Sequence, residues 1–265
     1  GDIVARAGEL GAAVERGAGV IVARAVPMTA QAGDWRGRVL TVALRAVRSV
    51  GSGSVGALGE GETAEVVALV PTGEDEQLAR AAQALERELG AALAGFGITV
   101  AWSRWTEDPV DLYRAGKEAE LAANVAEAEG RTLLAFEDTG AYRLLLPAMS
   151  EDPGELESFY EETLAPLAAY DEQYETELVK TVETYLDNDG NVAQTAASLF
   201  THRHTVRYRL ERVKELTGHD IGSSEGREKL SLGLKAMRVL GIATAAGPAT
   251  EPGAEGGRVR LPAED

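Results

Sequence analysis

The stretch that decides the fold is residues 191–218, NVAQTAASLFTHRHTVRYRLERVKELTG. Asn191 is a favoured N-cap residue, and the small and apolar residues after it predict a short helix over 192–199. A tight turn over 200–202 follows, and Arg203–Thr217 has the apolar spacing of a longer helix. A short helix, a brief turn and a basic second helix form the pattern of a helix-turn-helix.

The second helix is expected to have one buried and one polar side. At about 100° per residue, Val206, Leu210 and Val213 fall on one stripe together with Thr217, and we expect this stripe to be buried. The polar ridge opposite and the cations on both flanks suit a helix whose N-terminal half enters a major groove and whose basic side chains reach both phosphate backbones. The ridge holds His204 and Tyr208, one flank holds Arg203, Arg207 and Lys214, and the other holds Arg209 and Arg212.

The charge of this segment differs from that of the whole chain. The 265 residues carry 26 Lys and Arg against 43 Asp and Glu, a formal net charge of −17, which at first argues against nucleic acid. Residues 60–177, however, hold 27 of the acids and 7 of the basic residues, whereas Arg203–Lys214 holds five basic residues and one acid. The acidity therefore lies upstream, and the second helix is the densest basic cluster of the chain.

Two other interpretations of the basic helix are weaker. An ordinary solvated basic face is common, but here the turn, the short partner helix and the flanking cations occur together, which favours DNA binding. His202 and His204 suggest a metal pair, yet residues two apart on a helix point away from each other, and no further His or Cys completes a site. We therefore expect no metal and no cofactor.

Other apparent motifs fail on their context. The GxGxxG of Gly51–Gly56 follows a predicted helix and precedes a predicted strand, the reverse of the order that a dinucleotide fingerprint requires. Asp187–Asn191 imitates the start of a calcium loop, but the sixth and twelfth positions are Val192 and Ser198 rather than Gly and Glu. The chain has no Cys, which excludes thiolate nucleophiles and cysteine-ligated metals.

Upstream of Met149, strand and helix patterns alternate. The second and third predicted strands are close enough to pair as a hairpin around 59–62. We expect an α+β domain over 18–150, a mixed sheet with packed helices. The predicted helices are Arg6–Arg16, Arg36–Val50, Glu74–Leu93, Val110–Glu129 and Tyr142–Met149, and the predicted strands are Gly19–Ala25, Val55–Leu58, Glu65–Val70, Ile98–Trp102 and Leu133–Phe136.

After Met149 the strand signals stop. The tail over 241–265 contains 5 Gly and 3 Pro, and we expect it to be disordered. Around the α+β domain, the remaining divisions are an N-terminal helix or linker over 1–17, connecting helices over 151–175 and an all-α helix-turn-helix domain over 176–240. The predicted helices are Glu155–Tyr170, Glu172–Leu186, Val192–Leu199, Thr205–Thr217 and Arg227–Leu240.

No apolar run predicts a membrane span or a signal peptide. The longest runs, such as Val66–Pro71, reach about six residues, against the roughly 20 that a spanning helix needs. We expect a cytoplasmic protein that makes no membrane contact. Because the chain begins at Gly1 rather than Met, we also expect further sequence upstream.

The C-terminal segment closely resembles the helix-turn-helix of the PucR/CdaR family of bacterial transcriptional regulators. With its weaker extensions upstream, over 142–145 and 161–167, and downstream, over 227–240, and with the α+β region included, the resemblance covers about 18–240. It implies a ligand-responsive DNA-binding regulator, dimeric, with an effector sensed by a domain outside this chain. The residues that carry it are Tyr185, Leu186, Gly190–Ala193, Ala196, Ala197, Leu199, His202, Thr205–Leu210, Val213 and Leu216–Gly218.

The α+β region is similar to the GGDEF-like domain that precedes this module in the family. Its hairpin carries Gly59-Glu60-Gly61-Glu62-Thr63 where a diguanylate cyclase carries Gly-Gly-Asp/Glu-Glu-Phe. The sequence departs at the second Gly, at the following Asp/Glu and at the Phe, so we expect no enzyme and a role in dimerisation or signal transmission. The alternative is a nucleotide-binding or cyclase-like enzyme that uses Glu60 and Glu62.

The predicted partner is double-stranded operator DNA, bound by a homodimer. By position, the resemblance implies that the DNA-reading residues are at the start of the second helix, with further contacts one turn on. The predicted DNA-binding residues are His202, Arg203, His204, Thr205, Arg207, Tyr208, Arg209 and Arg212.

Overall fold

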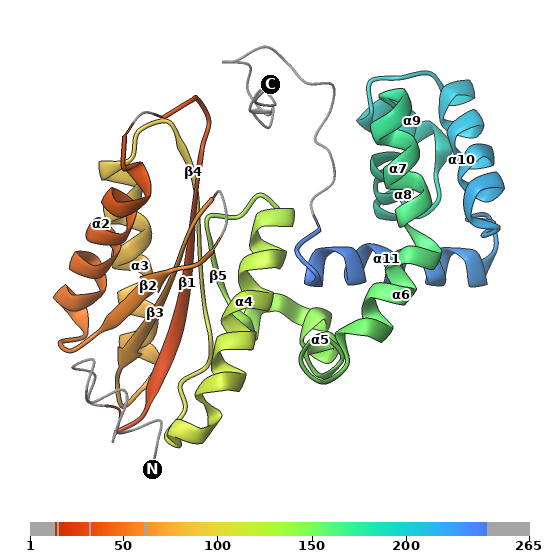
Figure 1. Ribbon diagram of the computed structural model, residues 1–265. Helices are drawn as coiled ribbons and strands as arrows, with labels where there is room; N and C mark the ends of the chain where they lie inside the picture. Colours follow the sequence, from red (N-terminus) through yellow and green to blue (C-terminus); the bar gives the residue numbers. More distant parts are fainter. Residues whose placement is uncertain (1–13, 15, 32, 61–62, 243–265) are drawn as a thin grey trace. The chain divides into compact units, whose positions relative to one another are not determined.

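The computed structural model describes residues 14, 16–31, 33–60 and 63–242 (Figure 1). The chain divides into two compact units, Gly1–Ser150 and Glu151–Asp265. The predicted helix Arg6–Arg16 lies outside the described residues apart from Val14 and Arg16, and so does the tail from residue 243 onward.

The first unit is built on a five-stranded sheet in the order β2-β3-β1-β4-β5. All neighbours are antiparallel except β4 and β5, which are parallel, so the sheet is mixed as predicted. The predicted hairpin forms, with Val55 opposite Leu69 and Leu58 opposite Val66. The strands are β1 (Ala18–Pro27), β2 (Val55–Leu58), β3 (Ala64–Pro71), β4 (Phe96–Trp102) and β5 (Leu133–Ala135).

Helices cover both faces of this sheet (Figure 1): α2 (Trp35–Val50) and α3 (Asp75–Ala92) lie on one face, and α4 (Leu112–Ala128) lies on the other. Alternate residues of β1 and β3, such as Ile21 and Val66, pack with α2 and α3 in one buried cluster. This period of two is what a strand buried between helix layers needs. The α+β architecture is confirmed.

The end of the first unit differs from the sequence prediction. Instead of one short helix over Tyr142–Met149, the chain forms a 3-10 segment, η2 (Phe136–Leu145), followed by α5 (Leu146–Glu151). Gly140 interrupts η2 at φ 61°, a left-handed conformation that glycine adopts without steric cost. A shorter 3-10 turn, η1 (Pro109–Asp111), precedes α4 and is capped by the side chain of Asp108.

The second unit is entirely helical over its described residues. Its core includes the fully buried Leu164, Leu167 and Leu230 together with Leu178, Val213 and others, so the predicted connecting helices contribute to the same core as the helix-turn-helix. The elements are α6 (Pro153–Thr163), α7 (Ala165–Tyr174), α8 (Leu178–Asp187), α9 (Val192–Ser198), α10 (Arg203–Thr217) and α11 (Ser224–Val239).

Two predicted long helices are each broken. Pro166, near the start of α7, has no N–H to continue the ladder, and the predicted helix Glu155–Tyr170 ends at Leu164. The predicted helix Glu172–Leu186 is interrupted because Glu175 adopts φ 51°. Asp171 then caps α8, since its carboxylate accepts hydrogen bonds from the N–H groups of Leu178 and Val179 at 2.7 and 3.0 Å.

Candidate nucleic-acid interface

The helix-turn-helix begins where the sequence predicts. Asn191 caps α9, because its side-chain oxygen accepts hydrogen bonds from the N–H groups of Ala193 at 3.0 Å and Gln194 at 3.2 Å. On α9, Ala196 and Thr195 are buried, whereas Ala193 and Ala197 are exposed. Of these three alanines, only Ala196 therefore lies on the buried side of α9.

Helix α10 buries the predicted stripe. Val206 and Val213 are fully buried, and Leu210 and Thr217 are half-buried. The helix ends at Gly218, whose φ of 74° is the left-handed C-terminal stop that glycine favours. The apolar side of α10 is thus used up in the core, and its polar side remains for solvent or a ligand.

His202 is the N-cap of α10 rather than a helical residue. Its Nδ1 accepts a hydrogen bond from the N–H of His204 at 3.3 Å, and the two rings stack with centroids 5.0 Å apart. Our argument that these side chains point away from each other was wrong, because His202 has an extended backbone. Still, no group of three possible metal ligands occurs among the described residues.

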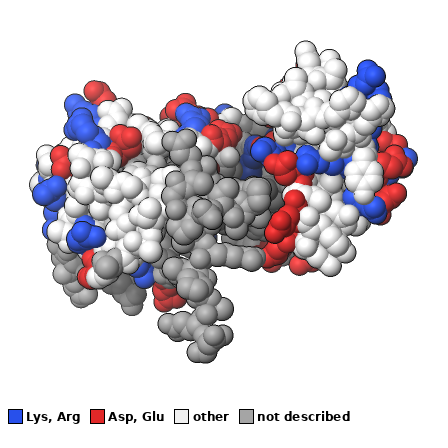
Figure 2. All heavy atoms as spheres, turned by 90° about the horizontal axis from the view of Figure 1, so that it is seen from above, with Lys and Arg blue, Asp and Glu red and all other residues white. Residues whose placement is uncertain are grey.

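The N-terminal half of α10 presents polar side chains to solvent. His202, Arg203, His204, Arg207 and Tyr208 are exposed, and Thr205 is half-buried. Neither Arg203 nor Arg207 has a side-chain hydrogen bond or ion pair with any residue that the structure describes. Elsewhere, Figure 2 shows basic side chains beside acidic ones on the face in view. Two unpaired cations at the start of a helix are therefore available to an anionic ligand.

Arg209 faces the interior of the unit instead. Its Nη1 lies 3.2 Å from Glu177 Oε2 and 3.2 Å from Thr181 Oγ1, both at the start of α8, and its side chain is 18% exposed. The wheel placed Arg209 on a flank reaching toward a phosphate. The packing of α10 against α8 instead gives this flank to an internal ion pair.

Arg212 is held in a small aromatic cluster. Its guanidinium lies 5.6 Å from the ring centroid of Tyr170 and 5.8 Å from that of Tyr208, and its Nη1 pairs with Glu215 at 2.7 Å. The hydrogen bond with Tyr208, followed by the charge of Glu215, raises the pKa of Arg212. Arg212 remains a cation, and one side of its guanidinium faces Tyr170 of α7. A helical wheel of α10 alone does not include this contact.

The structure says less about the hairpin that resembles the GGDEF motif. Glu60 is exposed at its turn, and Gly61 and Glu62 lie outside the described residues. The hairpin is tied to α2 by Arg36, whose Nη2 donates to the carbonyl of Gly59 at 2.7 Å. The fingerprint-like Gly51 ends α2 and precedes β2, the helix-then-strand order that led us to reject a dinucleotide site.

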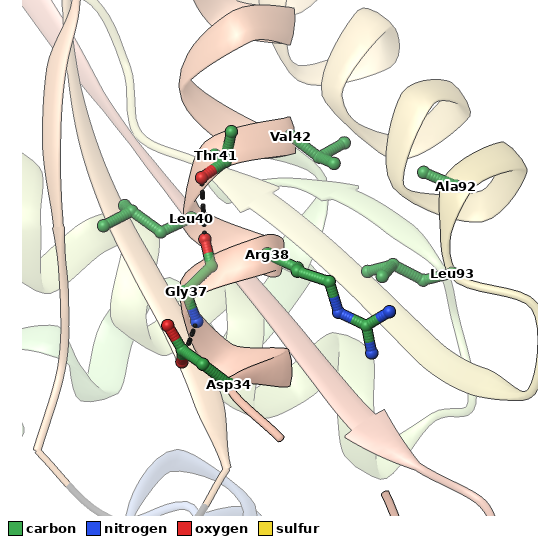
Figure 3. A pocket seen from close by; sticks show the side chains of 8 residues that line it. All are labelled: Asp34, Gly37, Arg38, Leu40, Thr41, Val42, Ala92 and Leu93. Carbon is green, nitrogen blue, oxygen red and sulfur yellow. Dashed lines mark hydrogen bonds between the residues drawn. The ribbon is translucent and has the colours of Figure 1, made fainter. Parts of the chain in front are cut away.

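A hollow of about 710 Å³ lies between α2 and the end of α3 (Figure 3). Asp34 is committed to the cap of α2, accepting from the N–H of Gly37 at 2.8 Å, and Thr41 donates to the carbonyl of the same residue. Arg38 is the cation that lines the hollow. One cation and committed polar groups do not define an effector site.

Among the described residues, no helix is both long enough and apolar enough to cross a membrane.

Comparisons with known proteins match both parts of the chain. A family model described as the PucR C-terminal helix-turn-helix domain matches residues 178–236, which extend from α8 into α11. A second model, described as a GGDEF-like domain, matches residues 1–125. The two matches fall in the helical unit and in the α+β unit, respectively.

Several curated proteins are similar to the chain. The proline-responsive transcriptional activator PutR of Bacillus subtilis (strain 168) is 32% identical over 126 residues, 48% of this chain and 30% of that protein. The purine catabolism regulatory protein of the same strain is 36% identical over 86 residues, 32% of this chain and 16% of that protein.

A third relative is the transcriptional activator PmfR of Paenarthrobacter nicotinovorans, 36% identical over 115 residues, 43% of this chain and 24% of that protein. The chain thus spans less than a third of the length of each of these relatives. The chain matches a GGDEF-like domain followed by the PucR C-terminal helix-turn-helix domain.

Proposed function

We propose that this protein is a DNA-binding transcriptional regulator that inserts the N-terminal half of α10 into the major groove of operator DNA. The observation that carries the proposal is the pair of exposed cations, Arg203 and Arg207, which have no partner among the described residues and lie on a flank of α10 beside the buried Val206 and Val213. Such a helix offers polar and basic groups to base edges and phosphates and keeps its apolar side in the core.

The roles of the exposed residues follow from their chemistry. Arg203, at the first position of α10, suits bidentate donation to a guanine edge. Because His202 Nδ1 is used as a cap acceptor, its other ring nitrogen is left to donate outward. His204, Thr205 and Tyr208 lie alongside as further base or phosphate contacts, and Arg207 and Arg212 reach for phosphates.

Arg209 acts from within the domain in this proposal. Its contacts with Glu177 and Thr181 join α10 to α8, and α8 packs through Leu178 and Val182 into the core. Arg209 is therefore a positioning residue: it fixes the orientation of α10 relative to α8, and it affects DNA binding through that orientation.

The remaining parts of the proposal concern assembly. The names of the relatives describe transcriptional activators and a catabolism regulator, which supports the same role here, in the cytoplasm. We propose a homodimer that reads two half-sites, and a GGDEF-like domain that works without catalysis in dimerisation or signal transmission. The effector acts through a domain outside this chain.

The direct test is binding of purified protein to fluorescent duplexes selected from random DNA. We expect selected duplexes to bind more tightly than scrambled ones, and a palindromic site with one half-site spacing would report the dimer. Arg207→Ala should weaken binding to both kinds of DNA and lower the slope of log affinity against log salt by about one.

Lys229→Ala is the matched control. Lys229 lies on α11 of the same unit and is paired with Glu225 at 3.0 Å, so its removal subtracts the same charge away from α10. If both variants lose the same affinity, only net charge matters and the groove assignment fails. Equal binding to selected and scrambled duplexes would remove the regulator function itself.

A further inference from the structure

We infer that Phe200, in the turn between α9 and α10, is a specificity-determining residue whose ring contacts the methyl group of a thymine at the edge of the half-site. The inference rests on the proposed DNA-binding function and extends it to a residue outside the predicted DNA-binding set. The basis of the inference is that the Phe200 side chain is not packed against the rest of the described chain.

The ring of Phe200 contributes no burial. The residue is 99% exposed, more than any other large hydrophobic residue among those described. A phenyl ring is one of the largest apolar groups that a protein can bury, and in this position none of that stabilisation is realised. Apolar packing within the chain therefore does not explain the residue.

The backbone conformation at Phe200 also favours glycine over phenylalanine. Its φ is 49°, in the left-handed region that glycine adopts freely and that a bulky side chain disfavours. The other described non-glycine residues with positive φ are Glu175 and Asp189, both polar. Strained conformations of this kind cluster at functional sites. Because the positive φ of Phe200 is unfavourable for folding, we assign the side chain an intermolecular role.

The turn fixes the backbone that carries the ring just before the start of α10. The N–H of Phe200 donates to the carbonyl of Ala197 at 3.2 Å, and the N–H of Thr201 donates to the carbonyl of Ala196 at 2.9 Å. Two residues later, His202 caps α10. Phe200 is thus anchored next to the side chains that the proposed function places in the groove.

The surrounding charge identifies the partner as DNA. No Asp or Glu occurs from Gly190 to Leu210, whereas the exposed and unpaired Arg203 and Arg207 do. An apolar ring set among cations without carboxylates fits a polyanion that carries apolar groups. In the major groove that group is the C5-methyl of thymine, which side chains such as Phe contact directly.

The test pairs Phe200→Gly with removal of the methyl group from the DNA. We expect Phe200→Gly to melt at the same temperature as the wild type or higher, since glycine relieves the backbone and no buried surface is lost. Its affinity for the selected duplex should fall about tenfold, while the salt slope stays unchanged because no charge is removed.

Replacing thymine by uracil, one position at a time, should weaken wild-type binding at one half-site position and have no effect there on Phe200→Gly. Leu232→Ala, a partly exposed apolar residue of α11, is the control and should bind as the wild type does.

Three results would overturn the inference. They are wild-type affinity of Phe200→Gly, a lowered melting temperature of this variant, or its dissociation to monomers in sedimentation, which would assign the ring to a protein interface. These outcomes leave the proposed function standing if the wild type still prefers selected DNA, and failure of that preference would refute the function itself.

Discussion

Two arginines of the α+β unit and the two at the start of α10 have different surroundings. In the α+β unit, Arg24 pairs with both Glu65 and Glu127, and Arg104 pairs with the buried Glu118. At the start of α10, Arg203 and Arg207 find no carboxylate among the described residues. For these four arginines, availability to an anionic ligand therefore depends on whether an acid lies beside the cation.

The same contrast recurs within α10. Its C-terminal half carries Arg212 and Lys214, which pair with Glu215 and Asp220, whereas Arg203 and Arg207, at its start, have no ion pair among the described residues. Each of the following predictions tests one side of this contrast, beginning with the largest expected effect.

Glu118→Ala should destabilise the protein most. Glu118 is 1% exposed and accepts hydrogen bonds from the backbone N–H and the Nε of Arg104, both at 3.1 Å. Its loss leaves these donors unpaired and should lower the free energy of unfolding by about 3 kcal/mol. Urea denaturation measures this change. Lys117→Ala, next to it and engaged only with Glu120, is the control; an equal loss there would contradict the structural assignment of the buried pair.

Arg203→Ala should act on DNA binding rather than on stability. Loss of a bidentate base contact corresponds to about 2 kcal/mol, or roughly thirtyfold in affinity for the selected duplex, with a much smaller change for scrambled DNA. Fluorescence anisotropy with both duplexes gives the ratio. A shift in unfolding free energy of comparable size would instead place Arg203 on the structural side of the comparison.

A double-mutant cycle tests the internal role of Arg209. We expect Arg209→Ala and Glu177→Gln each to destabilise the protein, with a coupling of about 1 kcal/mol, because the pair is partly buried. The chemical denaturation midpoints of the four proteins provide the cycle. Additive effects would mean that Arg209 is as available as Arg207, and the predicted phosphate contact would then be the better account.

Asp220→Asn should have the smallest effect. The hydrogen bond from Lys214, and next that from the N–H of Gly222, lowers the pKa of Asp220 below its usual value. A carboxyl with a lowered folded pKa stabilises the protein above its unfolded pKa and loses that contribution as the pH falls through the folded pKa.

The melting temperatures of wild type and Asp220→Asn should therefore differ slightly at neutral pH and converge in acid. Affinity for the selected duplex should not change, since Lys214 is not among the proposed DNA contacts. Increased affinity at neutral pH would extend the binding surface to Lys214, because the variant leaves this cation without its carboxylate partner.

Much of the fold was readable because local patterns and tertiary packing agree. Asn191 predicts the start of α9, and Val206 and Val213 predict the buried stripe of α10, which ends at Gly218. These signals are local, since caps and apolar periodicity act over a few residues. The break at Leu164 also had a visible signal in Pro166, which helical periodicity alone overlooked. The cap of α8 by Asp171 had none, because that carboxylate reaches its partners only after the chain turns at Glu175.

The sequence by itself determined the two fold classes, the bounds of α10 and the concentration of positive charge there, because each depends on residues close together in the chain. Only the tertiary structure decided which cations remain available. Arg207 and Arg209 are two residues apart, yet the packing of α10 on α8 brings Glu177 to Arg209 and no described acid to Arg207. Pairing of charges depends on distance in space, and residues 177 and 209 become neighbours only when the helices pack.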